Sequence, residues 1–214
     1  MTTQLSIYNG ALLLCKERFL ANLTENREPR YLLDHVWSNG GVQACLEQGQ
    51  WMFAMRTQQI DYDSGIEPSF GYNRAFDKPD DWVNTSAVCS DEFFRVPLTR
   101  YVDEADYWYS DIDTIFVRFV SNDPLYGMDM GKWTESFARF VEAYFAERIV
   151  GKLANSDELV KAVEKKKDDL LMIAKNKSAM AGPTQFSARG SWSNARNRFP
   201  NRRDGRNSSG SLIG

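Results

Sequence analysis

Nucleophilic catalysis by a Ser-His-Asp or a Cys-His arrangement would have to be built on His35, which is the one histidine of this chain. A Cys-His hydrolase would need His35 as its base and Cys45 or Cys89 as its nucleophile. The residues around His35 are typical of a histidine on the flank of a helix, so a structural role is the favoured interpretation. Cys15, Cys45 and Cys89 lie far apart without a C-x-x-C pair, so we expect reduced cysteines and neither a disulfide framework nor a zinc site.

Two acidic clusters, Asp103-Glu104-Ala105-Asp106 and Asp111-Ile112-Asp113, could bind a divalent cation or supply a catalytic pair. Neither cluster has the central glycine and the glutamate at position twelve of an EF-hand loop, so we interpret both as solvated turns. The phosphate-binding patterns G-x-x-x-x-G-K-[ST] and G-x-G-x-x-G do not occur. We therefore expect no catalytic residues, no cofactor and no metal, and a protein that is not an enzyme.

Charge is distributed unevenly along the chain, whose net charge is −3. Residues 183–214 contain six arginines and one aspartate and so carry +5, which leaves −8 on residues 1–182. Such a separation of charge is typical of an arm that docks on an acidic surface or on a polyanion. It is also typical of an arm whose charge only keeps it soluble.

Aromatic residues alternate with the arginines of this basic arm. The pattern fits single-stranded nucleic acid, whose bases stack on guanidinium and aromatic faces, and it fits equally an acidic groove on a protein partner. Trp192 disfavours a purely solubilising tail, because an exposed tryptophan gains nothing there and would be a natural anchor in a pocket. The predicted binding residues of the arm are Phe186, Arg189, Trp192, Arg196, Arg198, Phe199, Arg202 and Arg203.

Apolar periodicity predicts two helices in the first 50 residues. Residues 4–20 have apolar side chains at spacings of three and four, and a threonine at position 2 or 3 can cap this helix. Pro29 is typical of the first turn of a second helix, whose pattern runs from 31 to 46. Gly40 and Gly41 interrupt this pattern, and we expect a kink, a break or a tight packing contact there.

The pattern changes between 51 and 122, where turn residues separate short runs of aromatic and β-branched residues, which indicates a β-rich insertion. The predicted strands are Thr114–Val120, Trp82–Cys89, Tyr107–Ser110 and Phe93–Leu98. Helical periodicity returns from 133 to 151 with a broad aromatic stripe, and Ser156-Asp157-Glu158 predicts the start of a last helix that runs to about Ala181. We interpret the tryptophans of the folded body as core residues, with any exposed aromatics of the insertion available for a subunit contact.

The sequence therefore predicts a mainly α fold: a four-helix bundle with a β-rich insertion between the second and third helices and an extended C-terminal arm. Its expected parts are 1–50 (helices one and two), 51–122 (β-rich insertion), 123–181 (helices three and four) and 182–214 (basic arm). The chain has no run of 18 uncharged apolar residues and its N-terminus lacks a basic signal region, so we expect neither a membrane span nor secretion by the usual route.

Six short motifs follow one another in a defined order along the chain. They are LEQGQWMFAMRT at 46–57, FGY at 70–72, KPDDW at 78–82, DE at 91–92, DIDTIFVRFV at 111–120 and GSWSNAR at 190–196. Their order and spacing resemble the head-to-tail adaptor proteins of tailed bacteriophages, in particular the tail tubular protein A type of short-tailed phages.

The resemblance implies a virion structural protein of the phage neck and tail, assembled in the host cytoplasm as a homo-oligomeric ring, a dodecamer, beneath the portal vertex. The arm would then bind the portal protein through the eight residues named above, and the insertion at 51–122 would seat the tail nozzle protein. Genomic DNA would pass through the channel of the ring during ejection, and an acidic body facing this channel would repel its phosphates. The alternative is a nucleic-acid-binding module that acts through the basic arm.

Overall fold

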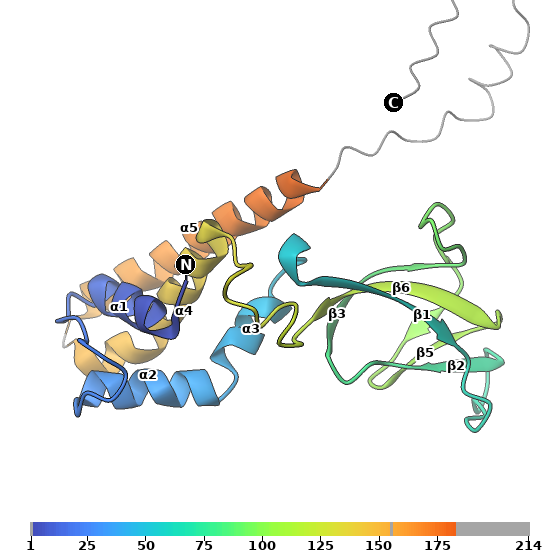
Figure 1. Ribbon diagram of the computed structural model, residues 1–214, viewed down its shortest axis with the longest axis horizontal. Helices are drawn as coiled ribbons and strands as arrows, with labels where there is room; N and C mark the ends of the chain where they lie inside the picture. Colours follow the sequence, from blue (N-terminus) through green and yellow to red (C-terminus); the bar gives the residue numbers. More distant parts are fainter. Residues whose placement is uncertain (1, 155, 183–214) are drawn as a thin grey trace, which may run out of the picture. The chain divides into compact units, whose positions relative to one another are not determined.

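The computed structural model of this chain describes residues 2–154 and 156–182, which form a helical part and a β part (Figure 1). The predicted arm therefore lies outside the described residues, apart from Gly182 at its start. Within the described residues, no helix has both the length and the apolar content needed to cross a membrane.

The helical part contains five α-helices and one short 3₁₀ helix among the described residues. They are α1 (Gln4–Leu14), α2 (Glu28–Ser38), α3 (Gly41–Glu47), η1 (Met52–Ala54), α4 (Glu135–Leu153) and α5 (Asp157–Ala181). Side-chain caps fix several starts: Thr3 and Ser6 form a capping box on α1, and the Ser156 hydroxyl accepts from the Leu159 N–H at the start of α5. Pro29 lies in the first turn of α2, where its missing N–H costs no hydrogen bond.

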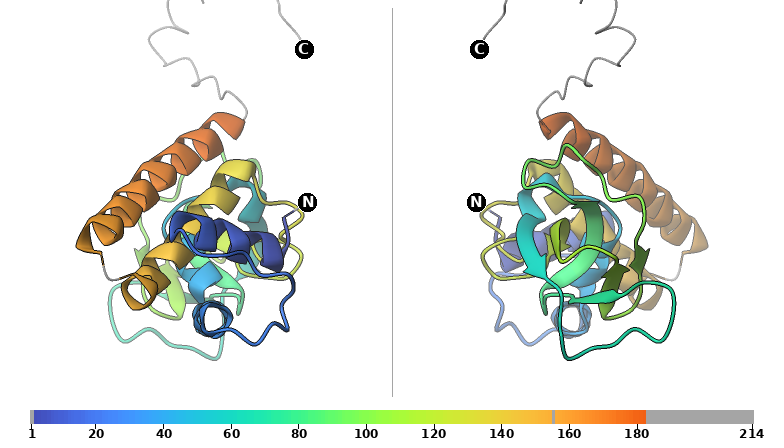
Figure 2. Two further views of the ribbon diagram at one scale, coloured as in Figure 1. Left: turned by 90° about the vertical axis from the view of Figure 1, so that its left-hand side faces the viewer. Right: turned by 90° about the vertical axis from the view of Figure 1, so that its right-hand side faces the viewer.

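Helix α4 is the centre of the helical part. Its aromatic and aliphatic side chains are buried on several sides, among them Phe137, Phe140, Tyr144 and Phe145. Helices α1, α2, α3 and α5 all contact it, as Figure 1 and the left-hand view of Figure 2 show. A helix that is apolar almost all round is stable only when neighbours cover it, so the other helices are arranged around α4.

The β part consists of two antiparallel three-stranded sheets (Figure 2, right). Its strands are β1 (Met55–Asp61), β2 (Arg74–Asp77), β3 (Trp82–Cys89), β4 (Val102–Asp103), β5 (Tyr107–Ser110) and β6 (Thr114–Ser121). The sheets have the strand orders β1-β6-β3 and β2-β5-β4. Phe76 and Trp108 of one sheet share a core with Val88, Ile115, Val117 and Phe119 of the other, so the two sheets pack on one another.

The prediction of a mainly α four-helix bundle is wrong. The chain has a mixed fold, 42% helical and 19% strand, with five helices and two sheets in the described residues. The pattern read as a second helix is two helices, because Gly40 has φ +77° and ends α2 in a left-handed conformation before α3 begins at Gly41. The helices are grouped around α4, and the six strands have a core of their own.

The first predicted helix is too long. Helix α1 ends at Leu14, and Lys16 follows with φ +59°. The chain then turns back, and the side chain of Asn9 pairs with both the N–H and the C=O of Leu20, at 2.8 and 3.1 Å. Leu20 is thereby buried in the helical core outside any helix.

Three of the four predicted strands are confirmed as β3, β5 and β6. The prediction of a strand at Phe93–Leu98 is wrong, because the carboxylate of Asp91 accepts hydrogen bonds from the backbone N–H groups of Arg95 and Val96 and closes a turn instead. Phe94 adopts φ +55° in this turn, and only Pro97 forms an isolated bridge, to Cys89. Strands β1, β2 and β4 were not predicted.

The close packing at Gly41 gives a test of the break between α2 and α3. A methyl group at Gly41 would lie 2.7 Å from the carbonyl oxygen of Val36 and 3.1 Å from the ring of Phe145. We expect Gly41→Ala to lower the free energy of unfolding by about 1–3 kcal/mol, the usual cost of overpacking. Urea unfolding followed by circular dichroism measures the change.

Gly151→Ala is the matched control, since Gly151 also lies in a helix but a methyl group there meets no atom within 4 Å. Its free energy of unfolding should be about 0.5–1 kcal/mol higher than that of the wild type, because alanine loses less conformational freedom than glycine when a helix forms. Equal stability of the two variants would contradict the packing argument.

Candidate functional site

The eight arm residues predicted to bind a partner, from 186 to 203, all lie outside the described residues. The other sequence candidates can be placed. His35 is exposed near the end of α2, where its ring Nδ1 lies 3.0 Å from the side-chain nitrogen of Asn39. Cys45 and Cys89 are buried, and burial raises the pKa of both thiols. Because the thiolate is the reactive form of cysteine, neither residue has the environment of an activated nucleophile.

The first acidic cluster contributes to an ion pair inside the β part. The Nζ of Lys78 lies 2.5 Å from an oxygen of Asp103 and 3.8 Å from the ring centroid of Trp82, and the Lys78 side chain is only 5% exposed. The indole N–H of Trp108 and the hydroxyl of Thr85 donate to the other oxygen of Asp103, at 3.1 and 2.8 Å. These contacts connect the end of β2 with β3, β4 and β5, so Asp103 is a structural residue.

The second acidic cluster lies in the turn before β6 and pairs with residues near the start of β2. The side-chain N–H of Asn73 donates to Asp111 at 3.0 Å, and Arg74 donates through Nε to Asp113 at the same distance. Arg74 also lies 4.0 Å from the ring centroid of Tyr62. Over the described ranges, no group of three or more His, Cys, Asp or Glu residues could hold a metal ion.

The negative charge of the body is concentrated in the β part. Residues 51–122 contain 13 acidic and 6 basic side chains, a net charge of −7, whereas the rest of residues 1–182 carries only −1. A basic partner would therefore be attracted mainly to the β part, and a polyanion would be repelled from it.

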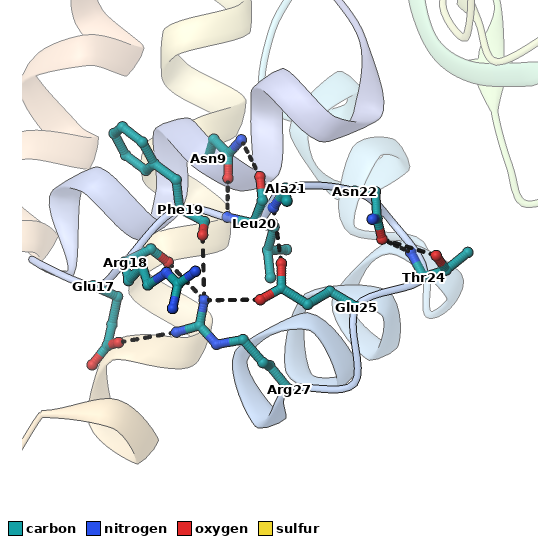
Figure 3. A network of polar contacts seen from close by, with 10 residues as sticks. All are labelled: Asn9, Glu17, Arg18, Phe19, Leu20, Ala21, Asn22, Thr24, Glu25 and Arg27. Carbon is teal, nitrogen blue, oxygen red and sulfur yellow. Dashed lines mark hydrogen bonds and ion pairs between the residues drawn. The ribbon is translucent and has the colours of Figure 1, made fainter.

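The loop that joins α1 to α2 is fixed by polar contacts of Arg27 and holds one aromatic side chain at the surface (Figure 3). The guanidinium of Arg27 donates to the carbonyl oxygens of Arg18 and Phe19, at 3.1 and 3.3 Å, and lies 3.9 and 3.8 Å from the carboxylates of Glu17 and Glu25. Phe19 remains 52% exposed. An exposed apolar group on an ordered backbone loses little entropy on binding, so this loop is a candidate contact surface.

Helix α5 offers a second candidate contact surface. Its partly buried side chains pack against the helical core, while Met172, Ile173 and Met180 are 66%, 48% and 78% exposed. The hydroxyl of Ser178 fixes the C-terminal half of this helix by donating to the Gln50 carbonyl oxygen and accepting from the Met52 N–H, both at 3.0 Å. The exposed apolar side chains of α5 and of the α1–α2 loop therefore belong to different elements.

The carboxyl group of Glu142 is a partly buried titratable group that was not among the candidates from the sequence. Glu142 is partly buried on α4, and Gly10 of α1 leaves room for it, since a methyl group at Gly10 would lie 2.2 Å from the Glu142 carboxyl carbon. Burial, with a smaller contribution from Glu135, raises the pKa of Glu142 to about 7. The signal available in the sequence was an acidic residue between the buried apolar residues Val141 and Ala143 of α4.

The comparisons with known proteins name no family for this chain. It matches no protein-family model, and no curated protein matches it significantly. Its function therefore has to be argued from its own residues.

The buried carboxyl of Glu142 predicts a pH-dependent stability. Its folded-state pKa of about 7 lies above the usual glutamate value, so the native state favours the protonated form. The contribution of the protonated Glu142 carboxyl to the free energy of unfolding is complete below about pH 4.3 and is lost as the pH rises through 7. We expect the free energy of unfolding of Glu142→Gln to exceed that of the wild type by about 2 kcal/mol at pH 8 and to equal it at pH 4. Thermal unfolding at both pH values measures the difference.

Glu164→Gln, at an exposed position of α5, is the control for loss of one negative charge. It should change the melting temperature little at either pH. A gain for Glu142→Gln that is the same at pH 4 and pH 8 would contradict the role of its ionisation.

Proposed function

We propose that this chain is a virion structural protein, an adaptor that forms a ring between the portal and the tail nozzle of a tailed bacteriophage. The observation that carries the proposal is the division of the chain into an acidic β part of charge −7 and a basic, aromatic-rich arm of charge +5. The order of the sequence motifs resembles that of the tail tubular protein A type of adaptor, and this resemblance indicates the portal protein and the tail nozzle protein as partners.

In this proposal the arm binds the portal protein. Arginine forms bidentate hydrogen bonds with carboxylates and stacks on aromatic rings, and tryptophan is the residue most enriched among interface hot spots. Trp192 lies among the arginines of the arm, so one arm can supply both the anchor and the charges around it.

The β part would face the tail nozzle, and the helical part would contribute contacts between neighbouring subunits. A ring needs two different complementary surfaces on each subunit. The α1–α2 loop with Phe19 and the outer face of α5 with Met172 and Met180 are two such exposed apolar surfaces on separate elements. Excess negative charge on the body would repel DNA phosphates and help the genome to pass.

A second candidate function is nucleic-acid binding through the arm. The specific observation in its favour is the alternation of arginines with Phe186, Trp192 and Phe199, because guanidinium and aromatic faces stack on unpaired bases. The two functions differ in the ligand that the arm binds, which is single-stranded nucleic acid in one and the portal protein in the other.

Removal of residues 183–214 tests the adaptor proposal. Binding of the shortened chain to assembled portal rings, measured by surface plasmon resonance, should fall below detection. Trp192→Ala in the full chain should weaken binding by about 30-fold or more, as expected for a hot-spot tryptophan. Wild-type affinity of either variant for portal rings would contradict a portal-binding arm.

Titration of the full chain and of the same two variants with single-stranded DNA at several salt concentrations tests the nucleic-acid alternative. A nucleic-acid module should show a logarithmic affinity that falls linearly with the logarithm of the salt concentration, with a slope set by the number of phosphates neutralised. An adaptor should bind portal rings tightly while its DNA binding is weak at physiological salt.

A further inference from the structure

A hollow with a volume of about 240 Å³ opens on the β part, between the β1–β2 connection and strands β4 and β5. Its lining includes Glu67, Phe70, Tyr72, Val102, Glu104 and Tyr109. Phe70 is 91% exposed, the largest exposed fraction of any large apolar side chain in the described residues. The hollow therefore combines aromatic walls with two carboxylates.

Neither of these carboxylates is paired with a basic side chain within the described residues, although the Nζ of Lys78 donates to the backbone carbonyl oxygen of Glu104. The lining contains no lysine or arginine, and neither Glu67 nor Glu104 takes part in an ion pair there. Burial and the nearby charge of Glu104 raise the pKa of the Tyr109 hydroxyl, which is consistent with a negative potential at this site. Two carboxylates without an ion pair in a concave site attract a cation.

The β part already contains two sites that combine the same chemical groups. Lys78 lies over the ring of Trp82 and pairs with Asp103, and Arg74 lies over the ring of Tyr62 and pairs with Asp113. In both, a cation is held between an aromatic face and a carboxylate. The hollow has the aromatic faces and the carboxylates, but no described lysine or arginine lines it.

We propose that this hollow binds an arginine side chain presented by a basic segment of a partner protein. Arginine fits better than lysine, because its planar guanidinium stacks on aromatic rings and can bond two carboxylates at once. A nucleic acid does not suit the site, since its phosphates would meet a β part of charge −7. The site can bind such a segment whether or not the chain is a phage adaptor.

The test uses the full-length ¹⁵N-labelled protein and the probe N-acetyl-arginine methylamide, followed by amide chemical shifts. The resonances of Gly71, Tyr72 and Val102 should move together and saturate with one dissociation constant. The citrulline analogue has the same shape without the charge, and it should bind at least about tenfold more weakly. Equal binding of the two probes, or shifts spread over the whole protein, would overturn the proposal.

Two double variants identify the carboxylates responsible. Glu67→Gln with Glu104→Gln should weaken binding of the arginine probe at least about tenfold. Glu92→Gln with Glu158→Gln removes the same charge at exposed positions outside the hollow and should change the affinity less than about twofold. An equal loss in both variants would show a non-specific charge effect and would also overturn the proposal. The portal is absent from this experiment, so its result is independent of the adaptor role.

Discussion

The burial of Trp51 determines how the helical and β parts join. Its indole N–H donates to the carbonyl oxygens of Cys45 and Leu46 at the end of α3, at 3.2 and 3.0 Å, and its ring lies 4.7 Å from that of Phe137. A buried tryptophan needs a partner for its N–H, and the last carbonyls of a helix need donors, so the two requirements are met together. Ser178 of α5 binds the backbone on both sides of Trp51, so the chain enters β1 from a fixed point.

The helices and strands whose limits depend on neighbouring residues in the sequence could largely be predicted. Caps and apolar spacing placed α5 closely, and β-branched and aromatic residues revealed β6. Strand β1 was missed because its sequence, MRTQQID, is largely polar and its stability comes from pairing with β6 along its whole length. Phe93–Leu98 has strand-like composition, yet the carboxylate of Asp91 satisfies the backbone N–H groups that a strand would have paired.

The candidate sites were predictable to very different degrees. Composition alone revealed the basic arm, because arginines and aromatics are local properties of the sequence. The hollow on the β part could not be found in this way, since Glu67 and Glu104 are far apart in the chain and only strand register brings them together. Tyr109 of the central strand β5 pairs with Ala75 on one side and Val102 on the other, which brings the two connections together. Register depends on long-range pairing, which composition does not encode.

Strand β6 belongs to both cores of the body. Ile115, Val117 and Phe119 point into the core between the sheets, whereas the next residue, Val120, is part of the helical core. Its two neighbours, β1 and β3, are antiparallel to it and bonded along most of its length. Mechanical load applied to the β part would therefore be carried by β6 as shear across two ladders of hydrogen bonds and transmitted directly to the helices. A single strand thus couples the packing of the two sheets to that of the helices.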